Sequence, residues 1–231
     1  MVCAGLLLAH TVLADRAGEL ITFASIKPGD KVADFVPDGD YFTRLFCKVV
    51  GDAGHVYVIG VPQLAVPSAS EVAGDCHNVT TSNLKSRLVP APELHDDSDP
   101  GYVYEYWSSS PAAENFTAPE PLDVIWTSDN YHDLHNKAFG SPDMSKVNTA
   151  LLAALKPGGL LLIEDHAAVV GSGARHSASL HRIAVEQVRE EVTQAGFEFV
   201  GELRHNDDTR TANAHDAHDK TDRFLLKFRK P

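Results

Sequence analysis

Basic residues are scarce in this chain. It contains 20 Lys and Arg against 32 Asp and Glu, which gives a formal net charge of -12. Sequence-independent binding to nucleic acid needs a concentration of basic side chains that can neutralise phosphates. The acidic residues are spread along the whole chain, so we expect no nucleic-acid partner.

Cysteines are also few, and their number is odd. Cys3, Cys47 and Cys76 are widely spaced and form no CxxC pair. This pattern indicates neither a disulfide framework nor a metal knuckle. We therefore interpret all three as small buried apolar side chains.

Long apolar runs are missing as well. Beyond the first residues, no stretch approaches the roughly 20 apolar residues that span a bilayer, so we expect no membrane partner. The N-terminal run has a Val-x-Ala before Asp15 but lacks the basic residues that open a secretory signal. We expect an amphipathic helix within residues 1–26, and a cytoplasmic rather than a periplasmic protein.

The sequence is rich in apolar, β-branched runs that alternate with amphipathic segments, and 43% of its 231 residues are hydrophobic. This pattern predicts one α/β domain over residues 1–231 with a mainly parallel sheet. The last two strands have no helix between them, so an antiparallel pair is expected there. Residues 204–221 are polar and rich in His and Asp, which is typical of a mobile loop. Strands are expected at residues 31–36, 55–61, 102–107, 122–127, 160–163, 197–203 and 223–228, and helices at 41–50, 143–155 and 179–195.

Four segments stand in order along the chain: KPGDKVADFVPDGDYFT, PLDVIWTSDNYHDLHN, LLAALKPGGLLLIEDHA, and VTQAGFEFVGEL followed by DRFLLKF. Together they resemble the class I S-adenosylmethionine (SAM) dependent methyltransferases, over residues 20–231. The chain looks closest to a bacterial subgroup of predicted methyltransferases with NYHDLH and DHA motifs. The resemblance implies a Rossmann-like three-layer sandwich around a mainly parallel seven-stranded sheet with an antiparallel terminal strand. It also implies a SAM-dependent transferase that acts on a small molecule.

The resemblance further implies where SAM would be held. In that family the first strand runs into an acid and a glycine-rich turn, because glycine lets the backbone approach the amino acid part of SAM. Here several of these positions carry larger side chains, and the second strand passes Ile59 without the acid that accepts the ribose hydroxyls. Either SAM still binds, or the chain kept the fold and changed its ligand. The positions that match the cofactor site are Asp34, Val36, Asp38, Gly39, Asp40, Asp129 and Asn130.

A cluster of Tyr, His and Asp follows the strands at 122–127 and 160–163. Carboxyl ends of parallel strands meet at one edge of a sheet, so these side chains are expected around one pocket. Imidazole, carboxylate and phenol groups suit general acid/base chemistry near neutral pH. They also suit a divalent metal such as Zn, Mn or Fe, although no metal-binding spacing is present. The candidate catalytic residues are Tyr131, His132, Asp165 and His166, and the ligands of a metal, if one binds, are His132, His135, Asp165, His166 and His181.

Three functions remain open from the sequence. The first is a SAM-dependent methyltransferase with His132 or Asp165 as the base. The second is an enzyme on the same fold that no longer transfers methyl groups and uses the cluster, with or without a metal, for lyase, isomerase or hydrolase chemistry. The third is a non-catalytic protein that binds a small molecule. A homo-oligomer is compatible with all three.

Overall fold

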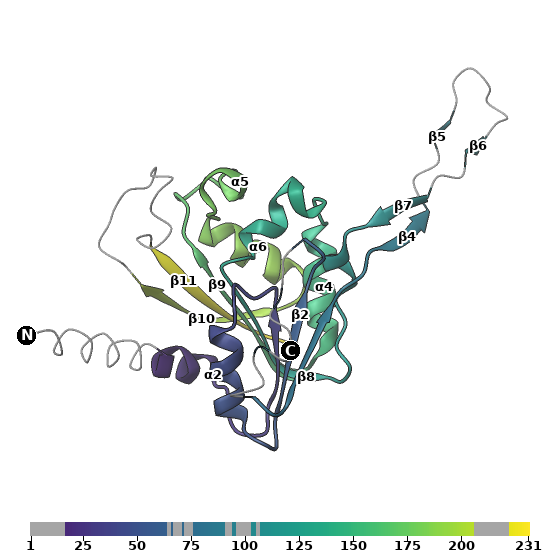
Figure 1. Ribbon diagram of the computed structural model, residues 1–231. Helices are drawn as coiled ribbons and strands as arrows, with labels where there is room; N and C mark the ends of the chain where they lie inside the picture. Colours follow the sequence, from purple (N-terminus) through teal and green to yellow (C-terminus); the bar gives the residue numbers. More distant parts are fainter. Residues whose placement is uncertain are drawn as a thin grey trace, which may run out of the picture.

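The computed structural model of the protein describes residues 17–63, 66, 71, 76–90, 94–95, 103–104, 107–205 and 222–231. A seven-stranded sheet with the order β3-β2-β1-β8-β9-β11-β10 forms its centre (Figure 1). The first five strands in this order pair in parallel, and β11 is antiparallel to both β9 and β10. The strands are β1 Lys31–Phe35, β2 His55–Gly60, β3 Val79–Asn83, β8 Leu122–Ser128, β9 Leu155–His166, β10 Glu198–His205 and β11 Arg223–Arg229.

Helices cover both faces of this sheet. Helix α2 (Tyr41–Val50) lies on one face, where Phe46 and Val50 pack with Leu20 from the helical residues 17–24. Helices α4 (Met144–Ala154) and α6 (Val185–Gln194) pack on the other face (Figure 1). The predicted Rossmann-like three-layer sandwich, with its mainly parallel seven-stranded sheet, is therefore confirmed.

The central strands read as continuous apolar runs because both faces are covered. In β2 every residue after His55 is buried, and in β8 all but Asp123 are buried. Trp126 of β8 is fully buried, and its ring centroid lies 4.8 Å from that of Phe42 on α2. The chain leaves β1 toward β2 and later returns to β8 on the other side of β1. Such a reversal of strand order places a ligand crevice at the carboxyl ends of β1 and β8.

Some predicted elements differ from the observed ones. The third strand of the sheet is β3, in a polar segment for which the sequence predicts no element. The strand expected at residues 102–107 lies partly outside the described residues. Its described ends, in β6 (Val103–Tyr104) and β7 (Trp107–Ser110), pair with β5 (Leu94–His95) and β4 (Arg87–Pro90) in two short antiparallel sheets that project from the body (Figure 1).

The helix expected at residues 179–195 is two helices. The first, α5 (Ser177–Leu180), ends at His181, whose φ of 51° is left-handed and cannot continue a helix. After this break the chain runs extended through Ala184 and enters α6. His181 is thereby held at a helix end instead of inside one.

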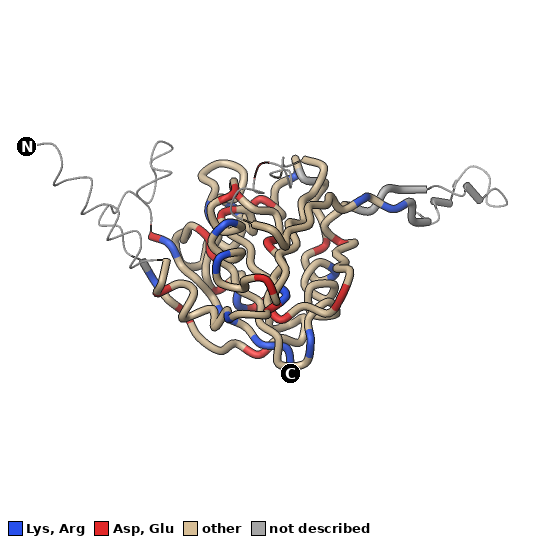
Figure 2. The backbone as a smooth tube through the Cα atoms, turned by 60° about the horizontal axis from the view of Figure 1, so that its bottom comes forward, with Lys and Arg blue, Asp and Glu red and all other residues tan. Residues whose placement is uncertain are grey.

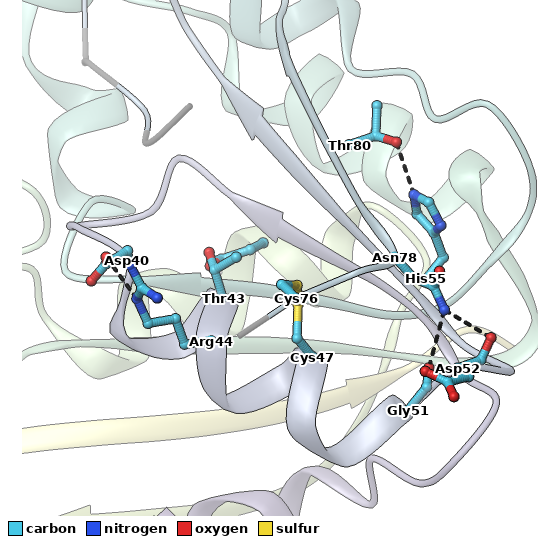
Figure 3. Close-up of a disulfide and its surroundings, with 11 residues drawn as sticks. Asp40, Thr43, Arg44, Cys47, Gly51, Asp52, His55, Cys76, Asn78 and Thr80 are labelled. Carbon is cyan, nitrogen blue, oxygen red and sulfur yellow. Dashed lines mark hydrogen bonds and ion pairs between the residues drawn. A yellow bond between two sulfur atoms is a disulfide. The ribbon is translucent and has the colours of Figure 1, made fainter. Parts of the chain in front are cut away.

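Cys47 and Cys76 form a disulfide, so the expectation that they are unpaired is wrong. Their Cα atoms lie 5.3 Å apart, and the bond joins α2 to the chain just before β3 (Figure 3). Nearby, Asn78 donates from Nδ2 to the carbonyl of Asp52 at 2.7 Å, which further ties these two segments (Figure 3). Cys3 lies outside the described residues.

Within the described ranges, no helix combines the length and apolar character needed to cross a membrane. Lys and Arg are dispersed among Asp and Glu over the described backbone, as Figure 2 shows. Most of the expected N-terminal helix, residues 1–16, and most of the predicted mobile loop, residues 206–221, lie outside the described part of the chain.

Candidate functional site

A cavity of about 230 Å³ opens at the carboxyl ends of β1, β8 and β9. This is the crevice that the strand order predicts. Its walls come from the turn after β1, the first turn of α2, the ends of β8 and β9, and the start of β11. The residues that line it are Leu20, Asp38, Tyr41, Phe42, Ser128, Asp129, Glu164 and Arg223.

Arg223 organises the polar wall of this cavity. Its Nη2 donates to Asp129 Oδ1, and its Nε lies 3.4 Å from Glu164 Oε1. Burial alone would lower the pKa of Arg223, but the Glu164 and Asp129 carboxylates outweigh it and raise the pKa. With Asp38, the lining carries three carboxylates and one guanidinium, a net of two negative charges. The cavity therefore suits a cationic ligand.

The turn after β1 is fixed from two sides. Val36 has a φ of 50°, which is strained for a β-branched residue, and its side chain is fully buried in the core beneath α4 and α6. Its N–H donates to Ile59 O at 2.7 Å, and Asn130 Nδ2 donates to its carbonyl at 2.9 Å. Asn130 thus positions the turn instead of lining the cavity. Gly39 has a φ of 82°, and a Cβ atom added there would meet nothing within 4 Å, so the turn is open to an approaching ligand.

The two remaining acids of this segment do not line the cavity. Asp40 pairs through Oδ2 with Nε of Arg44 at 2.8 Å, one turn along α2 (Figure 3). Asp34 is fully buried beneath α2 and accepts from Thr43 Oγ1 at 2.6 Å. Its other oxygen has no hydrogen-bond partner among the described residues. Burial raises the pKa of Asp34 to about 7, although the hydrogen bond from Thr43 opposes this shift.

The end of β2 is closely packed and carries no acid. Ile59 and Val61 are buried. A Cβ atom on Gly60 would meet Val66 at 2.3 Å and Asn83 Oδ1 at 2.5 Å, so only glycine fits. Within the described ranges, the Asn83 amide is the polar side-chain group that lies against Gly60.

The Asp165 carboxylate connects the segment after β8 with the last residue of β9. It is fully buried and accepts three hydrogen bonds: from the backbone N–H of His132 at 2.8 Å, from His132 Nδ1 at 2.7 Å, and from the backbone N–H of His166 at 2.7 Å. The imidazole of His166 turns to the cavity side, where Nε2 lies 3.3 Å from Asp129 Oδ1. Burial lowers the pKa of His166.

The ring of His132 turns to a different set of partners. Its Nε2 lies 3.3 Å from His181 Nδ1 and 3.4 Å from Asp133 Oδ1. Burial alone would lower the pKa of His132, but the charge and hydrogen bond of Asp165 outweigh it and raise the pKa. Burial raises the pKa of Asp133. Within the described residues, His132, Asp133 and His181 are the one group of His, Cys, Asp or Glu side chains arranged to hold a metal ion.

Tyr131 and His135 neither line the cavity nor belong to the group formed by His132, Asp133 and His181. Tyr131 is fully buried, and its hydroxyl donates to Glu191 Oε1 on α6 at 2.6 Å and accepts from Asn148 on α4 at 3.0 Å. His135 Nε2 lies 3.1 Å from the same Glu191 oxygen. Burial, and next the nearby Glu191 charge, raise the pKa of Tyr131 well above its usual value. Both side chains tie the turn after β8 to the helical layer.

The structure thus divides the predicted cluster between two faces of the sheet. Leu162 belongs to the core beneath α2 and Ile163 to the core beneath α4 and α6. Alternation continues this division, so Glu164 lines the cavity while Asp165 faces His132. Sequence reasoning did not single out Glu164, Arg223 or Asp133. The first two stand at the ends of predicted strands, which was the available signal, and Asp133 lies inside the quoted NYHDLH motif.

Solved structures of class I SAM-dependent methyltransferases share this fold. A SAM-dependent methyltransferase from Aquifex aeolicus matches with a TM-score of 0.56 and 15% identity, over 93% of this chain and 89% of that chain. The N-methyltransferase NodS from Bradyrhizobium japonicum WM9, in complex with S-adenosyl-L-homocysteine, matches with a TM-score of 0.55 and 13% identity, over 94% and 87%. The (4+2)-cyclase SpnF matches with a TM-score of 0.59 and 18% identity, over 94% and 81%.

At these identities the likeness shows the fold alone, and one of the three proteins is a cyclase, so the fold does not fix the reaction. No protein-family model matches the chain, and no curated protein matches its sequence.

Proposed function

We propose that the protein is a SAM-dependent methyltransferase that acts on a small molecule. The observation that carries this proposal is the acidic cavity at the carboxyl ends of β1 and β8. SAM has a sulfonium, an ammonium and a carboxylate group, so its net positive charge complements the lining. Tyr41 and Phe42 add aromatic faces, which attract cations such as a sulfonium.

The residues around the cavity fit the amino acid end of SAM. Asp38 and Gly39 at the turn, and Asp129 across from them, would hold the ammonium group. The cavity of about 230 Å³ is smaller than the roughly 300–1,000 Å³ of most ligand pockets, so it suits this end and not the whole nucleoside. Because β2 offers no acid to the ribose of SAM, the affinity for SAM should depend chiefly on contacts with its amino acid end.

SAM supplies an electrophilic methyl group when bound, and the chain must remove a proton from the acceptor. His166 stands beside Asp129, which lines the cavity, and its lowered pKa keeps the imidazole neutral at pH 7, as a general base requires. The Asp129 carboxylate would then stabilise the imidazolium that forms. His132 is less suited to this step, because its ring faces Asp133 and a second histidine outside the cavity lining.

Calorimetric titration with SAM and S-adenosylhomocysteine tests the binding half of the proposal. Asp38→Asn should weaken SAM binding about fivefold, since an exposed ion pair contributes up to about 1 kcal/mol. Asp52→Asn is the matched control: it removes one exposed acid at the opposite end of α2 and should leave the affinity unchanged. Absence of binding by the unaltered protein near millimolar SAM would reject the proposal.

Release of S-adenosylhomocysteine in the presence of a panel of small-molecule acceptors tests the transfer half. His166→Ala should lower kcat about 10²–10⁴-fold, the usual contribution of a general base, without changing the dissociation constant of SAM. If kcat and the affinity for SAM fell by the same factor, His166 would be assigned to SAM binding instead of proton transfer. SAM binding without product from any acceptor would argue for a repurposed fold.

A further inference from the structure

We propose that His132, Asp133 and His181 form a zinc site with one open coordination position. Three donor atoms converge here: His132 Nε2, Asp133 Oδ1 and His181 Nδ1. The two nitrogens lie 3.3 Å apart, and the Asp133 oxygen lies 3.4 Å from the first and 3.5 Å from the second. The site lies on the other face of the sheet from the cavity and does not depend on SAM binding.

The size of this triangle fits a tetrahedral ion. Zinc bonds of about 2.0–2.1 Å in tetrahedral geometry place neighbouring donor atoms about 3.3–3.4 Å apart. An octahedral ion with the same bond length would hold neighbouring donors about 2.9 Å apart. All three observed separations lie at the tetrahedral value or slightly above it, so zinc could enter this triangle with little movement of its donor atoms.

The hydrogen bonds around the triangle orient its donors inward. In the neutral tautomer of His132 whose Nδ1–H donates to Asp165 at 2.7 Å, the lone pair of Nε2 is directed at the other two donors. Such a carboxylate–histidine–zinc arrangement is the usual support of a metal-bound imidazole. Asp133 Oδ1 is buried and makes no hydrogen bond of good geometry in the described part of the chain. A proton shared between His132 Nε2 and His181 Nδ1 would satisfy these two nitrogens, whereas a bound metal ion would satisfy all three donors.

The ligand number points to a site that also binds a reactant. Structural zinc is almost always held by four protein ligands, whereas catalytic zinc has three and an open position. The exposed fractions of the side chains rise from 2% for His132 and 11% for Asp133 to 38% for His181, so the site opens to solvent at His181. The fourth position would take water or the anionic oxygen of a small molecule, such as a carboxylate or an enolate.

Untagged protein, purified without a chelator, provides the test. Elemental analysis should find one zinc per chain, and after chelation the apoprotein should take up one Co²⁺ with the intense visible absorption of tetrahedral geometry. His181→Asn should abolish this uptake while keeping the fold, because Asn tolerates the left-handed backbone of residue 181. His176→Gln, at the start of the same short helix, is the matched control and should bind Co²⁺ as before.

Asp165→Asn should weaken zinc binding about 10–100-fold and keep the tetrahedral spectrum, since Asp165 supports a ligand without being one. Undiminished uptake by both His181→Asn and Asp133→Asn would overturn the proposal. So would an octahedral Co²⁺ spectrum of the unaltered protein, which needs no variant to fold. Loss of binding when His205, His215 and His218 are replaced would assign the metal to that His-rich segment and equally reject the site.

Discussion

Burial of the Asp34 carboxylate makes the stability of this protein depend on pH in a direction opposite to that of most carboxylates. Asp34 lies in β1 between Val58 and Trp126 of the neighbouring strands and is fully buried. Its pKa in the folded protein is about 7, whereas an unfolded chain has the ordinary value of 3.8. Between these values the folded state holds a proton that the unfolded state has released, so the free energy of unfolding falls as pH rises.

The size of the effect follows from the shift. A difference of about three pKa units, at 1.36 kcal/mol per unit, makes a contribution of about 4 kcal/mol. This stability is fully present below about pH 4 and is lost as pH rises through 7. Between pH 5 and pH 8 the loss is about 3 kcal/mol. The asparagine side chain of Asp34→Asn cannot ionise, so the unfolding free energy of this variant lacks the pH-dependent contribution of the carboxyl group.

Urea unfolding of both proteins at pH 5, 6, 7 and 8, followed by circular dichroism, measures the difference. Other titrating groups are common to both proteins and cancel, so Asp34→Asn should gain about 3 kcal/mol relative to the unaltered protein across this range. Thr43→Val should move the transition to higher pH, because the Thr43 hydroxyl stabilises the charged carboxylate. Asp52→Asn serves as the exposed control. Parallel pH profiles for the unaltered protein and Asp34→Asn would refute the reasoning.

Three further outcomes follow from contacts elsewhere. Replacing Cys47 and Cys76 by Ser should lower the unfolding free energy by about 3–4 kcal/mol, from the closed loop of about 30 residues, and dithiothreitol should destabilise the unaltered protein equally but the double variant not at all. Tyr131→Phe should lower the unfolding free energy by about 1 kcal/mol, because it removes one hydrogen bond from the Glu191 carboxylate, which keeps His135 and Gln187 as partners, and it should leave SAM affinity unchanged; a large loss of affinity would contradict its placement. Arg223→Met should destabilise by about 1–3 kcal/mol, because it removes the cation paired with the buried Glu164 and the part-buried Asp129, and Arg229→Met, at the exposed end of the same strand, by less than about 1 kcal/mol; equal urea midpoints for the two would contradict this difference in burial.

The fold was predictable where burial leaves a pattern in the sequence. In β2 and β8 both faces are covered, so continuous β-branched and aromatic runs marked them as central strands. The strand β3, at the sheet edge, is half exposed and reads VTTSN, which carries no such signal. Its place depends on pairing with β2, a tertiary contact that local pattern does not encode. The disulfide was missed for the same reason, since 29 residues separate its cysteines and only the packing of α2 brings them together.

The sequence was sufficient to predict at which edge of the sheet the site lies, but not which of its side chains contact one another. Motifs after β8 and β9 named His132 and Asp165, which the structure pairs directly. The motifs did not show that the polar side chains of the cluster lie on two different faces of the sheet. That division depends on the alternation of β9 and on partners 49 and 60 residues away: His181 for His132 and Glu191 for Tyr131. No spacing rule covers such distances, because helices α5 and α6 bring these partners to the edge.

Backbone strain occurs at this edge of the sheet, beside each of the two proposed binding sites. Val36, Asp129 and His181 all have a positive φ without being glycine, and they border the cavity turn, the Arg223 pair and the His132 triangle respectively. Each such residue costs about 1–3 kcal/mol and persists only where its surroundings fix it. At Val36 two hydrogen bonds do so before any ligand arrives. A ligand that binds beside this turn does not have to order the turn first. Binding therefore avoids the entropic cost of ordering it, which makes the affinity higher.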